Sequence, residues 1–217
     1  MPEAPTHLVL TGPIGIFSDL HGDLTSLERL LGLEPTVNQW ISNGDLVDAN
    51  DDWPTVARLL AVARTHRVVC LLGNHEEVLA FTQVASEADA RTQQELYVMP
   101  RALTVTAGVT TMYCCHATPG RTDDFCSINR ASDEDLLEVF AGIKAKLVFW
   151  GHTHDKGLRS FGNKRFVNTG HLGRITATHS PQTYAIVSEQ GTVQLKVLPA
   201  VVKVGGIAPV GTSRGRR

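Results

Sequence analysis

Side chains that bind metal ions stand directly after apolar runs at five places in the chain. The set contains two carboxylates, four imidazoles and one amide: Asp19, His21, Asp45, Asn74, His116, His152 and His154. Mixed nitrogen and oxygen donors suit manganese, iron, cobalt, nickel or zinc better than calcium or magnesium. Because seven donors are too many for one ion, the set predicts two divalent ions, with manganese the first choice, that share a bridging carboxylate.

Two metal ions held about 4 Å apart favour the hydrolysis of phosphate esters, because they lower the pKa of a shared water and hold the phosphoryl oxygens during in-line attack. Our hypothesis is therefore that metal-bound hydroxide attacks phosphorus. The leaving oxygen then needs a proton, and His75, next to Asn74, is the candidate general acid. Asp48 is the candidate partner that would orient His75.

The segments before these residues have the apolar pattern of strands, and helices are expected between them. The expected strands of the first part of the chain are 14–18, 39–43, 67–72, a hairpin at 103–115, and 146–150. The expected helices are 24–31, one that starts near residue 52 or 53, 75–100, and 132–142 with a capping box. Ligands in α/β sheets gather beyond the carboxyl ends of the strands, so we expect the donors to converge.

The part of the chain after His154 is rich in threonine and valine and is divided by glycines. It predicts antiparallel strands near 157–161, 164–168, 173–178, 182–188 and 191–197. An α/β part followed by a β-rich part predicts two stacked sheets with helices outside. We expect one domain over residues 1–204 and a flexible tail at 205–217.

Composition excludes several classes of protein. With 42% hydrophobic and 19% charged residues the chain is typical of a globular protein, and no apolar run is long enough to span a membrane. A net charge of -2 argues against stable nucleic-acid binding. The four cysteines form no CxxC pair, and no secretory signal is recognisable, so we expect a cytoplasmic protein. The oligomeric state stays open.

Five blocks of this sequence, in this order, resemble the calcineurin-like metallophosphoesterase superfamily. The blocks are Asp19-Leu20-His21, Gly44-Asp45-Leu46-Val47-Asp48, Gly73-Asn74-His75-Glu76, His116 and Gly151-His152-Thr153-His154. The resemblance implies a four-layer αββα sandwich of two mixed β-sheets flanked by helices. It also implies that Asp19, His21, Asp45 and His154 hold one ion. By the same analogy Asp45, Asn74, His116 and His152 hold the other, His75 assists the leaving group, and Asp48 orients His75.

The resemblance leaves the substrate open. Residues 73–76 resemble the Ser/Thr protein phosphatases and diadenosine tetraphosphatases, but Ala49 and Asn50 stand where that branch has Arg-Gly. The segments 116–120 and 167–170 resemble small prokaryotic phosphodiesterases instead. We expect a small phosphorylated substrate, with nucleotides among the candidates. A non-catalytic scaffold that keeps the fold is the alternative from another class.

Some polar and sulfur-containing residues outside the blocks need separate interpretation. Arg121 and His171 are the candidates for contacts with substrate, because each follows a motif residue closely. We assign no role to the remaining histidines, His7, His66 and His179. Cys114 and Cys115 are predicted to be small buried residues on alternating faces of one strand.

Overall fold

Two β-sheets stack face to face in the computed structural model, which describes residues 6–37, 39–174 and 181–200. The six-stranded sheet has the order β1 (Thr6–Leu10), β5 (Ala102–Ala107), β6 (Thr110–Cys115), β7 (Leu147–Trp150), β9 (Lys164–Thr169), β8 (Lys156–Phe161). The five-stranded sheet has the order β11 (Val193–Val197), β10 (Thr183–Val187), β2 (Ile14–Phe17), β3 (Gln39–Ser42), β4 (Val68–Cys70). The helices are α1 (Leu24–Leu33), α2 (Trp53–Thr65), α3 (Asn74–Phe81), α4 (Ala90–Tyr97) and α5 (Asp133–Val139).

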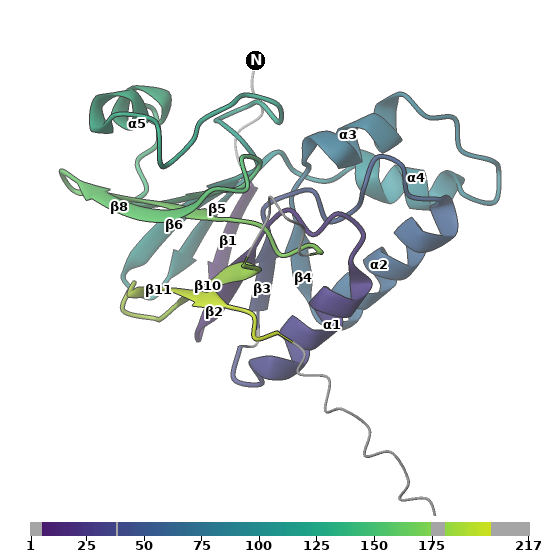
Figure 1. Cartoon of the computed structure of the whole chain (residues 1–217), viewed down its shortest axis with the longest axis horizontal. Coiled ribbons are helices and arrows are strands. Elements are labelled where there is room, and N and C mark those ends of the chain that lie inside the picture. The colour runs from purple at the N-terminus through teal and green to yellow at the C-terminus, as the bar shows by residue number, and fades with distance from the viewer. Residues whose placement is uncertain (1–5, 38, 175–180, 201–217) are drawn as a thin grey trace, which may run out of the picture.

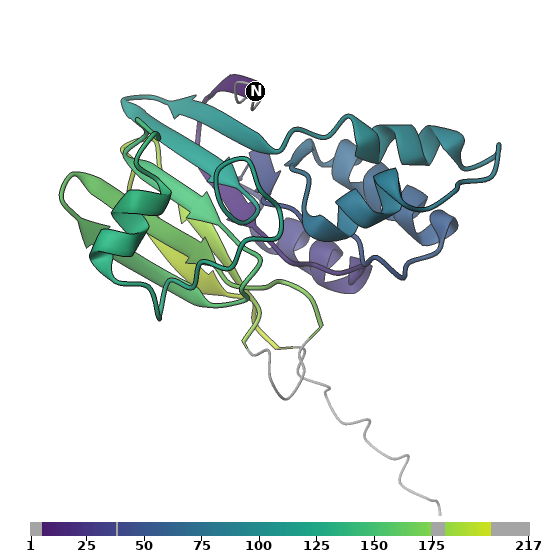
Figure 2. The same ribbon diagram turned by 90° about the horizontal axis from the view of Figure 1, so that it is seen from above.

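Three apolar cores separate four layers of secondary structure. The middle core lies between the sheets and contains residues such as Ile16, Ile41 and Phe149. A second core joins the five-stranded sheet to the four helices α1 to α4, and a third joins the six-stranded sheet to α5. Figures 1 and 2 show α1 to α4 gathered on one side and α5 apart from them, over the other sheet. The predicted αββα sandwich of two mixed sheets is confirmed.

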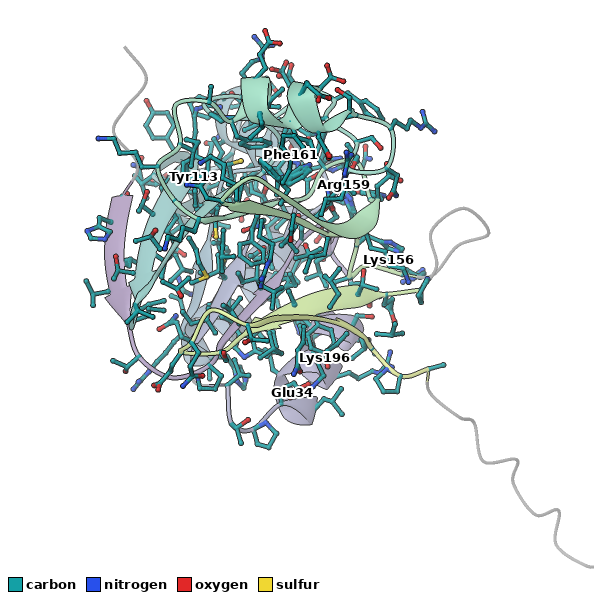
Figure 3. The ribbon with its side chains drawn as sticks, turned by 90° about the vertical axis from the view of Figure 1, so that its left-hand side faces the viewer. Glu34, Tyr113, Lys156, Arg159, Phe161 and Lys196 are labelled. Carbon is teal, nitrogen blue, oxygen red and sulfur yellow. The ribbon has the colours of Figure 1, made fainter. Side chains whose placement is uncertain are left out.

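The strands of the sandwich follow the expected alternation of faces. Cys114 belongs to the core between the sheets, whereas the next residue, Cys115, packs into the core beside α5. Both cysteines are fully buried, as their neighbours in the sequence predict. Figure 3 shows the layers edge-on, with Tyr113 and Arg159 on the outer side of the six-stranded sheet.

Side-chain caps start the helices where the sequence predicts them. The carboxylate of Asp52 accepts the backbone N–H of Thr55 at 2.9 Å, and Pro54 stands in the first turn of α2. Ser132 and Asp135 form the expected capping box of α5, with hydrogen bonds of 2.9 and 3.0 Å. These caps fix the residues at which α2 and α5 begin.

The expected helix at 75–100 is in fact two helices, α3 and α4. The side chain of Gln93 explains how the break is stabilised, since its amide donates to the carbonyl oxygens of Leu79 and Ala80, at 3.2 Å each, near the end of α3. A side-chain donor there satisfies carbonyl groups that have no partner within the helix. The sequence pattern shows only the polar residue, not the direction of its side chain.

The structure contains one strand that the sequence pattern does not predict, and another strand whose pairing differs from the expectation. The missed strand, β1, is an edge strand that pairs in parallel with β5, and its alternation is weak because it is largely exposed. Strand β9 pairs antiparallel with β8, as expected, but parallel with β7. The strand expected at 173–178 falls mostly outside the described residues, and so do His179 and the tail at 205–217. No helix in the described part of the chain is long and apolar enough to cross a membrane.

Candidate metal centre

The candidate ligands come from loops that follow parallel strands of both sheets. Strands β2, β3 and β4 run parallel in one sheet, and β6, β7 and β9 run parallel in the other. Hydrogen bonds join the two sets of loops: Nδ1 of His116 donates to the carbonyl of Asn43 at 2.8 Å. The backbone N–H of His152 donates to the carboxylate of Asp19 at 3.0 and 3.1 Å. The site therefore lies where the ends of the two sheets meet.

One group of donor atoms consists of Asp19, His21 and His154. Their ligand atoms lie within 4.8 Å of one another. Nε2 of His154 is 3.3 Å from Oδ1 of Asp19 and 3.1 Å from Nε2 of His21. Two imidazole nitrogens and a carboxylate that face one point are a donor set suited to a divalent transition metal.

The second group consists of Asp45, His116 and His152, with Asn74 beside them. The three titratable residues again have ligand atoms within 4.8 Å of one another. Oδ1 of Asn74 is 3.0 Å from Nε2 of His116 and 3.0 Å from Nδ1 of His152. The structure thus brings together the residues that the sequence motif places in one set.

Asp45 lies between the two groups. Its Oδ2 is 3.3 Å from Nε2 of His116, in the second group, and 4.0 Å from Nε2 of His21, in the first. A single carboxylate oxygen therefore faces imidazoles of both sets. This is the position that a bridging ligand requires.

The buried carboxylates of the site are ionised. Burial opposes ionisation of Asp19, but the hydrogen bond with His154 and the charges of His116 and His154 outweigh it and lower the pKa of Asp19 to about 2. Burial likewise opposes the charged form of His116, but the carboxylate of Asp45 raises the pKa of His116 to about 9. In the metal-free protein, a proton on Nε2 of His116 thus stabilises the buried negative charge. A divalent ion could replace that proton, so the donor set fits a metal.

The backbone at the candidate ligands is strained. Asp19, His21, Asp45, His152 and His154 have φ between 47 and 62°, in the left-handed region. Among the described residues only one other non-glycine residue, Arg67, has a positive φ. Such conformations are costly for residues with a side chain and cluster at functional sites. The strain therefore marks five of the seven candidate ligands that the sequence motifs indicate.

His75 lies beside the two groups and is held by the backbone. The N–H of Ala49 donates to Nδ1 of His75 at 2.9 Å, so the neutral ring carries its proton on Nε2, which is 3.9 Å from Oδ2 of Asp45. The nearest carboxylate oxygen of Asp48 is 3.8 Å from Nδ1. The direct hydrogen bond to His75 thus comes from Ala49, and the orienting role of Asp48 stays a prediction.

Two residues that support the site received no role in the sequence analysis. The fully buried carboxylate of Glu76 accepts three backbone N–H groups, those of Asp45 (2.8 Å), Gly73 (2.9 Å) and Val47 (3.0 Å). The amide of Asn168 donates to the carbonyl of Gly151 at 2.9 Å, next to His152. Glu76 stands in the first turn of α3, directly after the site residues Asn74 and His75, and this placement could have marked it as a positioning residue.

The two candidate substrate contacts have different positions. His171 is buried and stacks on His154, with ring centroids 5.5 Å apart. Arg121 lines a cleft of about 660 Å³ that begins at Asn74. Its guanidinium pairs with Asp124 at 2.7 Å and with Asp123 at 3.2 Å. Contact of either residue with a substrate stays a prediction.

The fold and the donor set together define a metallophosphoesterase sandwich. The family model for calcineurin-like phosphoesterases matches residues 12–156, so the chain belongs to that family. The family match supports a metal-dependent hydrolase that acts on phosphate esters. None of the curated proteins compared with the chain matches it.

Solved structures share the fold at low sequence identity. A hypothetical protein from Pyrococcus horikoshii has a TM-score of 0.71 at 12% identity, with 87% of this chain and 88% of that chain covered. A metallophosphoesterase from Sphaerobacter thermophilus has a TM-score of 0.65 at 20% identity, with coverages of 87% and 88%. Vacuolar Protein Sorting 29 from Cryptosporidium parvum has a TM-score of 0.58 at 15% identity, with coverages of 86% and 90%. These likenesses concern the fold alone.

Proposed function

We propose that the chain is a dinuclear metal-dependent phosphoesterase that hydrolyses phosphate mono- or diesters. The observation that carries the proposal is the position of Asp45, whose Oδ2 faces His116 at 3.3 Å and His21 at 4.0 Å. A carboxylate between two groups of metal donors is what a two-metal site needs.

The charge of the site supports the same conclusion. Asp19 and Asp45 are 0% and 2% exposed, and the imidazoles around them are neutral when they act as ligands. Buried carboxylates without matching positive charge are costly, and metal coordination is one of the few ways to compensate them. The intact donor set and the strained backbone at five ligands favour an enzyme over a scaffold that has lost its site.

The two groups support one assignment of the residues to the two ions. Asp19, His21, Asp45 and His154 would hold one, and Asp45, Asn74, His116 and His152 would hold the other. The mixed nitrogen and oxygen donors favour manganese, with iron, zinc, cobalt and nickel as alternatives. When bound, such ions stabilise charge on the phosphoryl group and lower the pKa of water.

The protein itself supplies the proton for the leaving group. Hydrolysis forms a bond between a water oxygen and phosphorus and breaks the bond from phosphorus to the leaving oxygen, which then needs a proton. The hydrogen bond from Ala49 to Nδ1 leaves the proton of neutral His75 on Nε2, the nitrogen that faces Asp45. His75 is thus oriented to act as general acid.

Metal reconstitution tests the proposal. Protein stripped with a chelator and reloaded with manganese should bind two ions and hydrolyse p-nitrophenyl phosphate or its bis-ester, whereas the stripped protein should not. If the protein binds two ions but hydrolyses neither ester, the proposed phosphoesterase activity is wrong. Fewer than one bound ion, together with unchanged activity in His75→Ala, would favour the scaffold.

A further inference from the structure

The cleft beside Asn74 is the natural place for the part of a substrate that lies beyond the phosphate. Its volume is about 660 Å³, and α3 lines one side with Asn74, Glu77 and Val78. Arg101 and the segment 120–123 line the other parts. Because Asn74 lines the cleft and is also a candidate metal ligand, the cleft adjoins the candidate metal site.

The charges in the cleft are already compensated within the protein. Arg101 contacts the carboxylate of Glu77 at 2.5 and 3.3 Å, and the hydroxyl of Thr122 donates to the same carboxylate. Arg121 pairs with Asp124 and Asp123. The cleft thus offers hydrogen-bonding groups without a surplus of positive charge. This environment suits an uncharged polar group such as a sugar better than a chain of further phosphates.

An exposed aromatic pair, Phe81 and Tyr97, lies at the C-terminal end of α3, beyond the residues that line the cleft. Asn74, Val78 and Phe81 are spaced by four and three residues, so they lie on one face of the helix. Phe81 is 49% exposed and Tyr97 is 54% exposed, with ring centroids 4.9 Å apart. The rise of the helix places Phe81 about 10 Å from Asn74 along its axis.

The aromatic pair lies one turn of α3 beyond the polar part of the cleft. Arg101 contacts Glu77. Tyr97, which stands four residues before Arg101, contacts Phe81, which stands four residues after Glu77. The chain from Tyr97 to Arg101 therefore runs alongside α3 in the opposite direction. A molecule that starts at Asn74 meets first the polar groups and then the two rings.

We propose that this surface binds a nucleoside, with its sugar in the polar cleft and its base against Phe81 and Tyr97. The substrate is then a nucleoside phosphoester with a single phosphoryl group at the metals. Aromatic side chains bind bases of any sequence by stacking, because every base has a π-face. This inference rests on the proposed phosphoesterase function and adds the substrate class.

Two diesters with the same leaving group test the inference. They are the p-nitrophenyl ester of thymidine 5′-monophosphate and ethyl p-nitrophenyl phosphate. Manganese-loaded protein should have a kcat/KM for the thymidine ester about 5- to 100-fold above that for the ethyl ester, the range expected for one stacked base. Phe81→Ala and Tyr97→Ala should each move this ratio toward one, whereas Phe81→Trp should keep it. Val109→Ala, at an 89% exposed apolar residue in the β5–β6 turn, is the matched control.

A binding measurement without turnover complements the kinetics. Calorimetric titration with thymidine, which has no phosphoester bond to hydrolyse, should show binding, and Phe81→Ala should remove it. Equal kcat/KM values for the two diesters, or an equal ratio in Phe81→Ala and wild type, would overturn the inference. So would a higher kcat/KM for diadenosine tetraphosphate than for the thymidine ester. Hydrolysis of neither diester, nor of p-nitrophenyl phosphate, by protein with two bound metal ions would instead contradict the proposed function.

Discussion

Glu76 holds the backbone of Asp45 through a hydrogen bond of 2.8 Å from the Asp45 N–H to its Oε2. The same oxygen accepts the N–H of Gly73, so one buried carboxylate joins the loop after β3 to the loop after β4. Burial and the nearby charge of Asp45 raise the pKa of Glu76 to about 7. A residue that touches no substrate thus positions the candidate bridging ligand.

Glu76→Gln should weaken metal binding. Glutamine keeps only one acceptor oxygen and turns an amide donor toward backbone N–H groups, so the loop of Asp45 must shift. We expect the affinity for manganese to fall about 10- to 100-fold, as for other residues that orient metal ligands. Equilibrium dialysis measures the affinity, with Glu95→Gln on α4 as a control. Unchanged affinity for manganese in Glu76→Gln would show that the hydrogen bonds to the Glu76 carboxylate are not needed for metal binding.

Asp45→Asn should affect both ions. Because Asp45 faces both groups, we expect fewer than one bound ion per chain, whereas His154→Ala should keep one. The value of kcat should fall more than about 100-fold in Asp45→Asn, beyond the range for residues that only orient ligands. Elemental analysis of the purified variants counts the ions. One full equivalent of metal in Asp45→Asn would argue against a bridge.

His75→Asn should slow esters with poor leaving groups most. An alkoxide needs a proton, and loss of a general acid costs about 100-fold or more in rate, whereas p-nitrophenolate leaves without one. The comparison is kcat for methyl phosphate esters against p-nitrophenyl esters. The metal content should stay unchanged, since the side chain of His75 is not a proposed ligand. An equal loss for both kinds of ester would place His75 in binding instead of proton transfer.

The ion pair of Glu34 and Lys196 should contribute to stability in a way that depends on pH. Burial alone would raise the pKa of Glu34, but hydrogen bonds from Lys196 and Tyr184 outweigh it, so the pKa lies below its ordinary value of 4.5. The two labelled side chains lie together below the five-stranded sheet in Figure 3. A lowered carboxyl pKa stabilises the fold above the unfolded pKa, and this stabilisation is lost as the pH falls through the folded pKa.

The measurement for this pair is the free energy of unfolding in urea between pH 3 and 7. Glu34→Gln should lower it by about 0.5 kcal/mol at pH 7, a value typical of solvent-screened pairs. The difference from wild type should shrink below about pH 4.5, where the carboxylate takes up a proton. Glu28→Gln, at an exposed position of α1, the helix that ends next to Glu34, is the control. A difference that is constant with pH would mean that the charge of Glu34 contributes nothing.

The residue types and their spacing were sufficient to predict most of the candidate site. Each candidate ligand follows an apolar run, and the carboxyl ends of parallel strands lie at one edge of a sheet, so convergence follows from local pattern. Two stacked sheets with helices outside could also be predicted, because an α/β part of the chain is followed by a β-rich part. The exposed edge strand β1 and the break between α3 and α4 could not be predicted, because the sequence pattern of these segments is weak.

Contacts between distant segments were decided only by the tertiary structure. No local pattern indicates that the N–H of Ala49 and not the carboxylate of Asp48 binds His75, or that Glu76 holds Asp45. The same is true of Arg101 and Tyr97, which reach α3 from a segment about twenty residues later. The sequence by itself determined the family, the candidate donors and the layers, since these depend on residue type and period. The cleft and the orientation of His75 depend on how loops from separate strands pack, which only the assembled sheets define.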